Sequence, residues 1–222
     1  MRILLVADIH ANWPALQAID EPHDLCFCLG DLVDYCLDPA PCLDWVRRRA
    51  HYGVRGNHDH GVAQNVVVTG RAGFKYLSGV TRVLTQQRLG EDDLRFLGNL
   101  PVTQFVTVDE TRFLLVHASP RDPLDEYAYP DVEFWTRRLQ NVEPHYNRRG
   151  RAALPQVVFG NSQQGIQADP VGAKVTVEGS GRNLAKDCAV RQEKHVRHCC
   201  ALVADRRLQT EAGAQRKVRA AR

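Results

Sequence analysis

The sequence has little of what marks secreted or membrane-spanning chains. Its seven cysteines are few and irregularly spaced for 222 residues, and an odd number leaves at least one unpaired, which argues against a disulfide scaffold. Cys26 and Cys28 lie on one face of an expected strand, where we predict packed core thiols. No apolar run approaches the roughly 18 residues of a membrane span, and Asp8 and His10 interrupt the first run early. We therefore expect a soluble, cytoplasmic protein without a membrane partner.

Aromatic side chains are absent from residues 181–222, so this stretch lacks a platform on which nucleic-acid bases could stack. The stretch carries 11 Lys and Arg against 4 Asp and Glu, a local charge of +7. Because the net charge of the whole chain is +3, residues 1–180 are mildly acidic, at −4. We predict one domain over 1–180, followed by a basic tail over 181–222 that is solvated and disordered or has diverged.

Short apolar runs alternate with helical patterns in the first part of the chain, which is typical of an α/β fold. We expect strands at 2–7, 25–29, 52–55, 104–108, 111–116, 156–159 and 171–177. We expect helices near Pro14, with Asn12 as cap, and over 39–50 and 131–140. Leu77, Val80, Val83 and Leu84 recur at helical spacing, which predicts helices within 61–100 that pack on the sheet or cover the site.

Several of the expected strands end abruptly in side chains of the kinds that bind metals. These stretches are Asp8-Ile9-His10, Gly30-Asp31, Gly56-Asn57-His58-Asp59 and His117. Their carboxylate, imidazole and amide groups suit Mn, Fe, Zn or Mg, and a carboxylate can bridge two ions. Two ions roughly 3.5–4 Å apart can clamp the attacking and leaving oxygens of a displacement at phosphorus. The pattern therefore indicates a metal site assembled from strand ends.

In order and spacing, these motifs resemble the signature of the calcineurin-like metallophosphoesterases, especially their small prokaryotic phosphodiesterases and phosphatases. The resemblance covers about residues 1–160. It implies an α/β (α+β) fold, a two-sheet β-sandwich flanked by helices, with two divalent metal ions at the strand ends. It also implies the ligands: Asp8 and His10 for the first metal, Asp31 as the bridge, and Asn57 and His117 for the second.

The same resemblance implies that His58 is a catalytic residue and not a metal ligand. His58 would protonate the leaving oxygen or stabilise the charge of the transition state, oriented by a carboxylate such as Asp59. The implied activity is hydrolysis of a phosphomonoester or phosphodiester by a metal-activated water. The implied substrate is a small phosphate ester or a nucleotide, and the oligomeric state stays open.

One motif departs from the family pattern. The family usually has Gly-His-x-His after a late strand, whereas this chain has Gly160-Asn161-Ser162-Gln163. The carbonyl oxygens of Asn161 and Gln163 remain candidate ligands, but they are weaker donors for transition metals than imidazoles. We predict a site that binds metal weakly, prefers Mg or Mn, or is impaired.

Two alternatives to a competent small-molecule enzyme stay open. One is a degenerate family member whose fold serves as a binding or scaffold module. The other is a nucleic-acid phosphodiesterase guided by the basic tail, although the missing aromatics favour a tail that is merely solvated.

Overall fold

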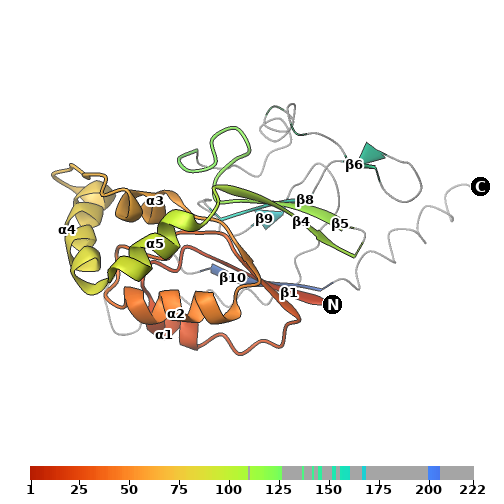
Figure 1. The fold of residues 1–222 in the computed structure, drawn as a ribbon, viewed down its shortest axis with the longest axis horizontal. Helices are drawn as coiled ribbons and strands as arrows, with labels where there is room; N and C mark the ends of the chain where they lie inside the picture. The colour runs from red at the N-terminus through yellow and green to blue at the C-terminus, as the bar shows by residue number, and fades with distance from the viewer. Residues whose placement is uncertain are drawn as a thin grey trace, which may run out of the picture.

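The computed structural model of the chain describes residues 1–109, 111–126, 137, 142, 145–146, 152–153, 156–160, 167–168 and 200–205 (Figure 1). Apart from Arg137, the helix expected over 131–140 lies outside these residues, as does the strand expected over 171–177. None of the described helices is both long and apolar enough to cross a membrane.

The first sheet has the strand order β10-β1-β2-β3. Three of its strands are parallel and were expected: β1 (Arg2–Ala7), β2 (Leu25–Cys28) and β3 (Tyr52–Gly53). Every residue of β1 after Arg2 is buried, as its nearly continuous apolar run requires of a central strand. The fourth strand, β10 (Cys200–Asp205), pairs antiparallel with β1, with Cys200 opposite Ala7. No strand was expected there, within the predicted basic tail; the domain boundary at 180 stays a prediction.

The second sheet has the order β4-β5-β8-β9. β4 (Thr103–Val108) and β5 (Thr111–Val116) form the expected antiparallel hairpin. β8 (Gln156–Phe159), also expected, runs parallel to β5, and β9 (Gln167–Ala168) pairs antiparallel with β8. A separate short pair joins β6 (His145–Tyr146) to β7 (Ala152–Ala153).

Alternate residues of β1 face two different hydrophobic cores. Leu5 and Ala7 belong to a core that also contains Leu115 and Val158 of the second sheet, so the two sheets pack face to face. Leu4 and Val6 point to the other side, into a core formed with the helices. Figure 1 shows α1 and α2 below the first sheet and the second sheet above it. This arrangement confirms the predicted two-sheet fold with flanking helices. Cys26 and Cys28 are 0% and 1% exposed, as expected of core thiols.

The helices are α1 (Trp13–Gln17), α2 (Pro39–Arg49), α3 (Asn57–Ala63), α4 (Gly73–Arg88) and α5 (Glu91–Asn99). The predicted cap is present, since the Asn12 side chain accepts a hydrogen bond from Ala15 N at 3.2 Å. Helix α4 turns a polar face inward: its buried residues are Ser78, Thr81, Arg82 and Thr85. Two of the apolar residues that suggested this helix, Val80 and Val83, are 46% and 53% exposed.

Candidate metal centre

The candidate ligands converge at the carboxyl ends of the parallel strands. Asp8 and His10 follow β1, Asp31 follows β2, and His117 follows β5. His58 lies in the first turn of α3. Parallel strands end at the same edge of a sheet, so loops that are far apart in the sequence meet there.

The two loops that carry most of these residues have an uncommon backbone conformation. Asp8, His10, Ala11 and Asp31 all have positive φ angles, of 51°, 47°, 55° and 57°. Such angles cost residues other than glycine about 1–3 kcal/mol each, and they persist only where the surroundings enforce them. Hydrogen bonds between the loops do so here: His10 N donates to Asp31 O at 2.9 Å, and Ala11 N to Leu32 O at 2.8 Å.

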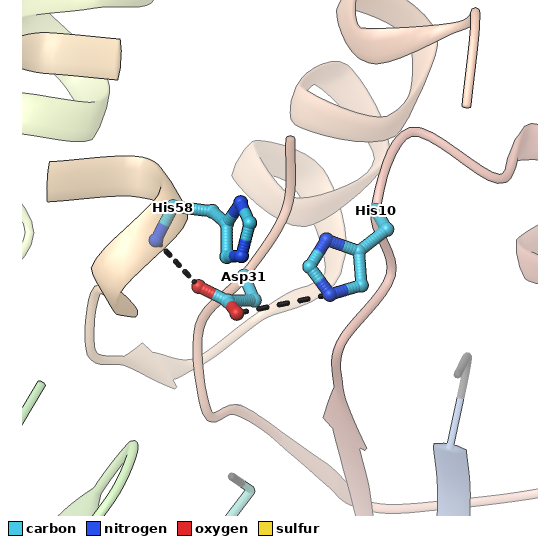
Figure 2. A group of neighbouring side chains, drawn as sticks. All are labelled: His10, Asp31 and His58. Atoms are coloured by element: carbon cyan, nitrogen blue, oxygen red, sulfur yellow. Dashed lines mark hydrogen bonds and ion pairs between the residues drawn. The ribbon is translucent and has the colours of Figure 1, made fainter. Parts of the chain in front are cut away.

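Asp31 lies at the centre of the site. Its Oδ2 atom is 3.3 Å from His117 Nε2. The same atom is 3.7 Å from His10 Nε2, and Oδ1 accepts a hydrogen bond from His58 N at 2.9 Å (Figure 2). Two groups of side chains could each hold a metal ion: Asp31 with His10 and His58, and Asp31 with Asp8 and His117. Within each group the ligand atoms lie within 4.8 Å of one another. Asp31 belongs to both groups, as a bridging carboxylate would.

Close packing at Asp31 explains the glycine of the third motif. A Cβ atom on Gly56 would lie only 2.1 Å from Asp31 Oδ1. Any larger residue would push the start of α3 away from this carboxylate. Gly56 therefore allows the His58 backbone to reach Asp31.

The charges in the site are strongly coupled because they share a buried space. Burial opposes ionisation of Asp31, but the neighbouring His117, His58 and His10 outweigh it and hold the pKa of Asp31 below its usual range. Burial is also the main reason that the pKa of Asp8 rises to about 7, although His117 opposes the rise. Burial alone would lower the pKa of His117, but the charge of Asp31 raises it to about 10.

Two of the imidazoles are held in the orientation that a metal ligand needs. His117 Nδ1 lies 2.8 Å from Leu29 O, and His10 Nδ1 lies 2.9 Å from Val33 O. In a neutral ring whose Nδ1–H donates a hydrogen bond to a carbonyl, Nε2 carries no proton and its lone pair can bind a metal ion. His117 Nε2 is buried and makes an ion-pair contact with Asp31 Oδ2 at 3.3 Å, but no geometric hydrogen bond within the described part of the chain. These donors and the clustered carboxylates therefore fit divalent metal ions.

Asp59 has contacts other than the expected one to the His58 ring. Its carboxylate accepts three backbone hydrogen bonds, from Gly56 N at 2.9 Å and from Asp31 N and Leu32 N at 2.8 Å each. Asp59 is fully buried, and burial, with the charge of Asp31, raises its pKa to about 7. Asp59 thus ties the loop after β2 to the start of α3, and another carboxylate orients His58.

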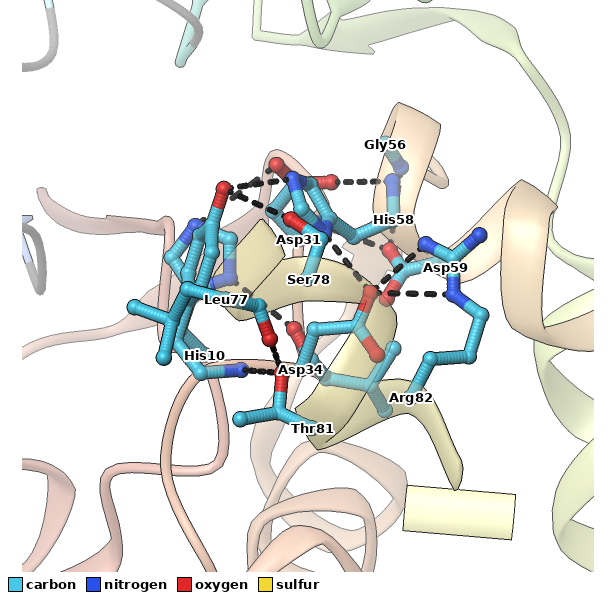
Figure 3. Close-up of polar contacts among 12 residues, drawn as sticks. His10, Asp31, Asp34, Gly56, His58, Asp59, Leu77, Ser78, Thr81 and Arg82 are labelled. Carbon is cyan, nitrogen blue, oxygen red and sulfur yellow. Dashed lines mark hydrogen bonds and ion pairs between the residues drawn. The ribbon is translucent and has the colours of Figure 1, made fainter. Parts of the chain in front are cut away.

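That carboxylate is Asp34, which sequence reasoning missed. Its Oδ2 lies 2.8 Å from His58 Nδ1 and also accepts a hydrogen bond from Arg82 at 2.6 Å (Figure 3). On the other side of the ring, the Tyr35 hydroxyl lies 3.3 Å from His58 Nε2. A second Asp three residues after Asp31 was the available signal. Nothing in the local pattern pointed to Arg82, which is 48 residues from Asp34.

The remaining candidates are only partly described. Asn57 is half-buried at the start of α3, beside His58. Asn161 and Gln163 lie outside the described residues. Gly160, which precedes them, donates a hydrogen bond from its N atom to His117 O at 2.9 Å, so this loop starts beside a candidate ligand.

Two packed sheets with carboxylates and imidazoles clustered at their strand ends define an α/β protein with a candidate metal centre. The sequence model of the calcineurin-like phosphoesterases matches residues 1–161, and the chain belongs to that family. Members of this family bind divalent metal ions and hydrolyse phosphoesters. The family prediction made from the motifs is thus confirmed.

Individual relatives are more distant. An uncharacterized protein of Methanocaldococcus jannaschii is 31% identical over 138 residues, which cover 58% of this chain and 54% of that protein. The chain thus spans about half the length of this curated relative. A hypothetical protein of Pyrococcus horikoshii has a similar fold, with a TM-score of 0.58, 14% identity, and coverage of 97% and 93% of the two chains. A metallophosphoesterase from Sphaerobacter thermophilus is 32% identical over 59% of this chain and 52% of its own, with a TM-score of 0.47.

Proposed function

We propose that the protein is a metal-dependent phosphoesterase that hydrolyses a phosphomonoester or phosphodiester at a two-metal site. The observation that carries this proposal is the place of Asp31 in both groups of candidate ligands. A carboxylate shared by two ligand groups is the arrangement that a pair of metal ions requires. We further propose a small phosphate ester or nucleotide as the substrate and the cytoplasm as the location.

The assignment of residues to the two ions follows the family motifs; the structure divides the same site differently, with Asp8 beside His117 and His10 beside His58. Asp8, His10 and Asp31 would bind the first ion, and Asp31, Asn57 and His117 the second. The carbonyl groups of Asn161 and Gln163 would complete the site, which would favour Mg or Mn over Fe or Zn. When bound, two such ions lower the pKa of a water molecule and stabilise charge on the attacking and leaving oxygens.

His58 is proposed as the acid that serves the leaving oxygen. Asp34 Oδ2 lies 2.8 Å from Nδ1 of the ring, and Nε2, on the other side, lies 3.3 Å from the Tyr35 hydroxyl. Burial opposes a charge on His58, but Asp31 and Asp34 outweigh it and raise the pKa of the ring above its usual value. The protonated ring could therefore donate a proton from Nε2, or stabilise negative charge there.

The test is hydrolysis of p-nitrophenyl phosphate and bis(p-nitrophenyl) phosphate with Mn, Mg, Fe or Zn added, together with metal analysis of the purified protein. We expect turnover with Mn that is lost in Asp31→Asn and in His58→Asn. Bound metal should be lost only in Asp31→Asn. Arg121→Ala is the control, because this side chain is 65% exposed and pairs with Glu126. No turnover with any of the metals, in folded protein, would refute the proposal.

A second candidate function rests on the amides at Asn161 and Gln163. If the two amides lower the metal affinity so far that catalysis is lost, the fold serves as a binding or scaffold module. Replacement of outer partners of metal ligands typically costs about 10–100-fold in affinity or activity, and loss of the ligands themselves should cost at least that. We expect Asn161→His with Gln163→His to raise metal content and activity at least about tenfold over wild type, which is the lower end of that range. Catalytic silence of both forms would favour the scaffold.

A further inference from the structure

The buried residues of α4 are all polar, while Leu77 and Leu84 of the same helix are half-buried. These buried residues are Ser78, Thr81, Arg82 and Thr85. Ser78 Oγ donates to the Tyr35 hydroxyl at 3.2 Å, and Tyr35 N donates to Thr81 Oγ1 at 3.0 Å. Burying polar groups costs free energy unless they are hydrogen-bonded. The hydrogen bonds of these residues therefore connect α4 to the loop beside His58.

Arg82 makes the most direct of these contacts. It is only 7% exposed, and its NH2 and Nε atoms donate to Asp34 Oδ2 at 2.6 and 3.2 Å (Figure 3). Its NH1 atom donates to Val66 O at 3.0 Å. A buried guanidinium is stable only with such partners. The side chain is thus fixed at both ends of its planar group.

Helix α3 makes room for this guanidinium. A Cβ atom on Gly61 would lie 2.4 Å from Arg82 NH1 and 2.7 Å from its Cζ. The guanidinium therefore lies against the bare backbone of α3, in the same helix as His58. An added methyl group at this position would displace the flexible end of Arg82 and leave the rest of the packing in place.

Arg82 and His58 share one oxygen atom. Asp34 Oδ2 accepts from the guanidinium and lies 2.8 Å from His58 Nδ1, and Asp34 is 0% exposed. Because the guanidinium holds this carboxylate in one orientation, the carboxylate in turn holds His58 with Nδ1 toward it and with Nε2 beside the Tyr35 hydroxyl. Without Arg82, the carboxylate could rotate about its last bond and release the ring.

We propose that Arg82 is a positioning residue, which acts through Asp34 to orient the His58 ring for its role at the leaving oxygen. The role of His58 at the leaving oxygen rests on the proposed function. The orientation of the His58 ring by Arg82 and Asp34 rests on geometry alone. Among the described residues, the hydrogen bonds of Arg82 go to Asp34 and Val66 and to none of the candidate metal ligands.

The first test measures the orientation of the His58 ring and does not depend on enzyme activity. The Nδ1–H signal of His58 in metal-free protein, assigned by its disappearance in His58→Asn, is recorded by NMR. We expect Arg82→Met and Gly61→Ala to shift or broaden it. Thr85→Val should leave it unchanged, because Thr85 lies on the same buried face and its hydroxyl has no partner among the described residues. An unchanged signal in folded Arg82→Met and Gly61→Ala would overturn the proposal.

The second test uses turnover of p-nitrophenyl phosphate with Mn. We expect kcat to fall about 10–100-fold in Arg82→Met, by analogy with other residues that orient active groups through a neighbour. KM and metal content should stay near wild type, since the candidate ligands are untouched. In the His58→Asn background, Arg82→Met should have no further effect on kcat. Additive losses, or a loss of metal that matches the loss of kcat, would overturn the proposal.

The two tests separate the two proposals. If wild type turns over no phosphoester with any metal, the proposed function fails, while the His58 signal still decides whether Arg82 orients the ring. If wild type is active but Arg82→Met keeps both its signal and its kcat, only the role of Arg82 fails. Gly61→Ala supplies the answer if Arg82→Met does not fold.

Discussion

Helices α2 and α4 present opposite faces to the interior of the same domain. Helix α2 buries its apolar residues, Pro39, Cys42, Leu43, Trp45 and Val46, and leaves Arg47, Arg48 and Arg49 at its C-terminus. Helix α4 buries Ser78, Thr81, Arg82 and Thr85 and exposes Phe74, Tyr76, Val80 and Val83. Burial of a large apolar side chain contributes about 1.5–3 kcal/mol, so α2 is held by the hydrophobic effect. Helix α4 instead makes hydrogen bonds from its buried polar residues to the loop that orients His58.

This difference indicates a division of tasks. Damage to α2 should act mainly on stability, because its buried residues Cys42, Leu43, Trp45 and Val46 belong to the hydrophobic core. Damage to the inner face of α4 should reach the site, because its contacts end on Asp34 and Tyr35. Each of the following substitutions tests one side of that division.

The largest effect is expected from Asp34→Ala. It leaves the buried Arg82 without its carboxylate, and breaking a buried ion pair on one side costs about 3–5 kcal/mol. Urea unfolding measures the loss. The matched control is Asp44→Ala on α2, which breaks an exposed Asp–Arg pair of 3.1 Å and should cost less than about 1 kcal/mol. Equal losses in the two variants would mean that the α4 pair is no more important than a surface pair.

Leu43→Ala should destabilise α2 by a similar or slightly smaller amount. The side chain is 0% exposed in the core formed with β1 and β2, and such truncations cost about 2–5 kcal/mol. The His58 Nδ1–H signal and the kcat of the folded fraction should stay at wild-type values. A changed His58 signal in this variant would contradict the division between the two helices.

The buried thiol of α2 predicts how stability depends on alkaline pH. Burial raises the pKa of Cys42 from 9.0 to about 12, with a smaller contribution from Asp38. The unfolded chain therefore releases this proton first, so the stabilisation is complete below pH 9 and is lost as pH rises toward 12. At pH 10 the loss should be about 1 kcal/mol for this thiol. Between pH 8 and pH 10, the free energy of unfolding of Cys42→Ala, measured with urea, should fall by about 1 kcal/mol less than that of wild type.

Thr85→Val should stabilise α4 slightly. Its Oγ1 atom is buried and has no hydrogen-bond partner in the part of the chain that the structure describes. An unsatisfied buried hydroxyl costs about 1–3 kcal/mol, and valine has nearly the same shape. We expect the free energy of unfolding to rise by about 1 kcal/mol. A fall of similar size would indicate that the hydroxyl is satisfied in solution.

The smallest effect is expected on the outer face of α4. Val83 is 53% exposed, so Val83→Ser should change the free energy of unfolding by less than about 0.5 kcal/mol. The equivalent change on α2, Val46→Ser, removes a side chain that is 2% exposed and should cost several times more. A large loss in Val83→Ser would mean that the apolar face of α4 is covered in solution.

Much of the architecture was readable before the structure. The apolar runs at 2–7 and 25–29 specified β1 and β2, because continuous apolar strands must be covered on both faces. The hairpin of β4 and β5 was also readable. Strand β10 was missed, although Ala201, Leu202 and Val203 form a short apolar run, because its pairing with β1 joins the two ends of the chain. The two strands of that pair contribute nothing to each other's local pattern.

The sequence by itself determined the family and the set of candidate ligands, since Asp8, His10, Asp31 and His117 are recognisable by residue type and order at strand ends. Only the tertiary structure decided which groups contact His58. The nearest carboxylate in sequence, Asp59, binds backbone N–H groups, while Asp34 holds the ring and Arg82 holds Asp34. Periodicity shows that a helix has two unlike faces. Which face turns inward depends on the residues that the helix packs against, and for α4 these include a buried carboxylate from a distant loop.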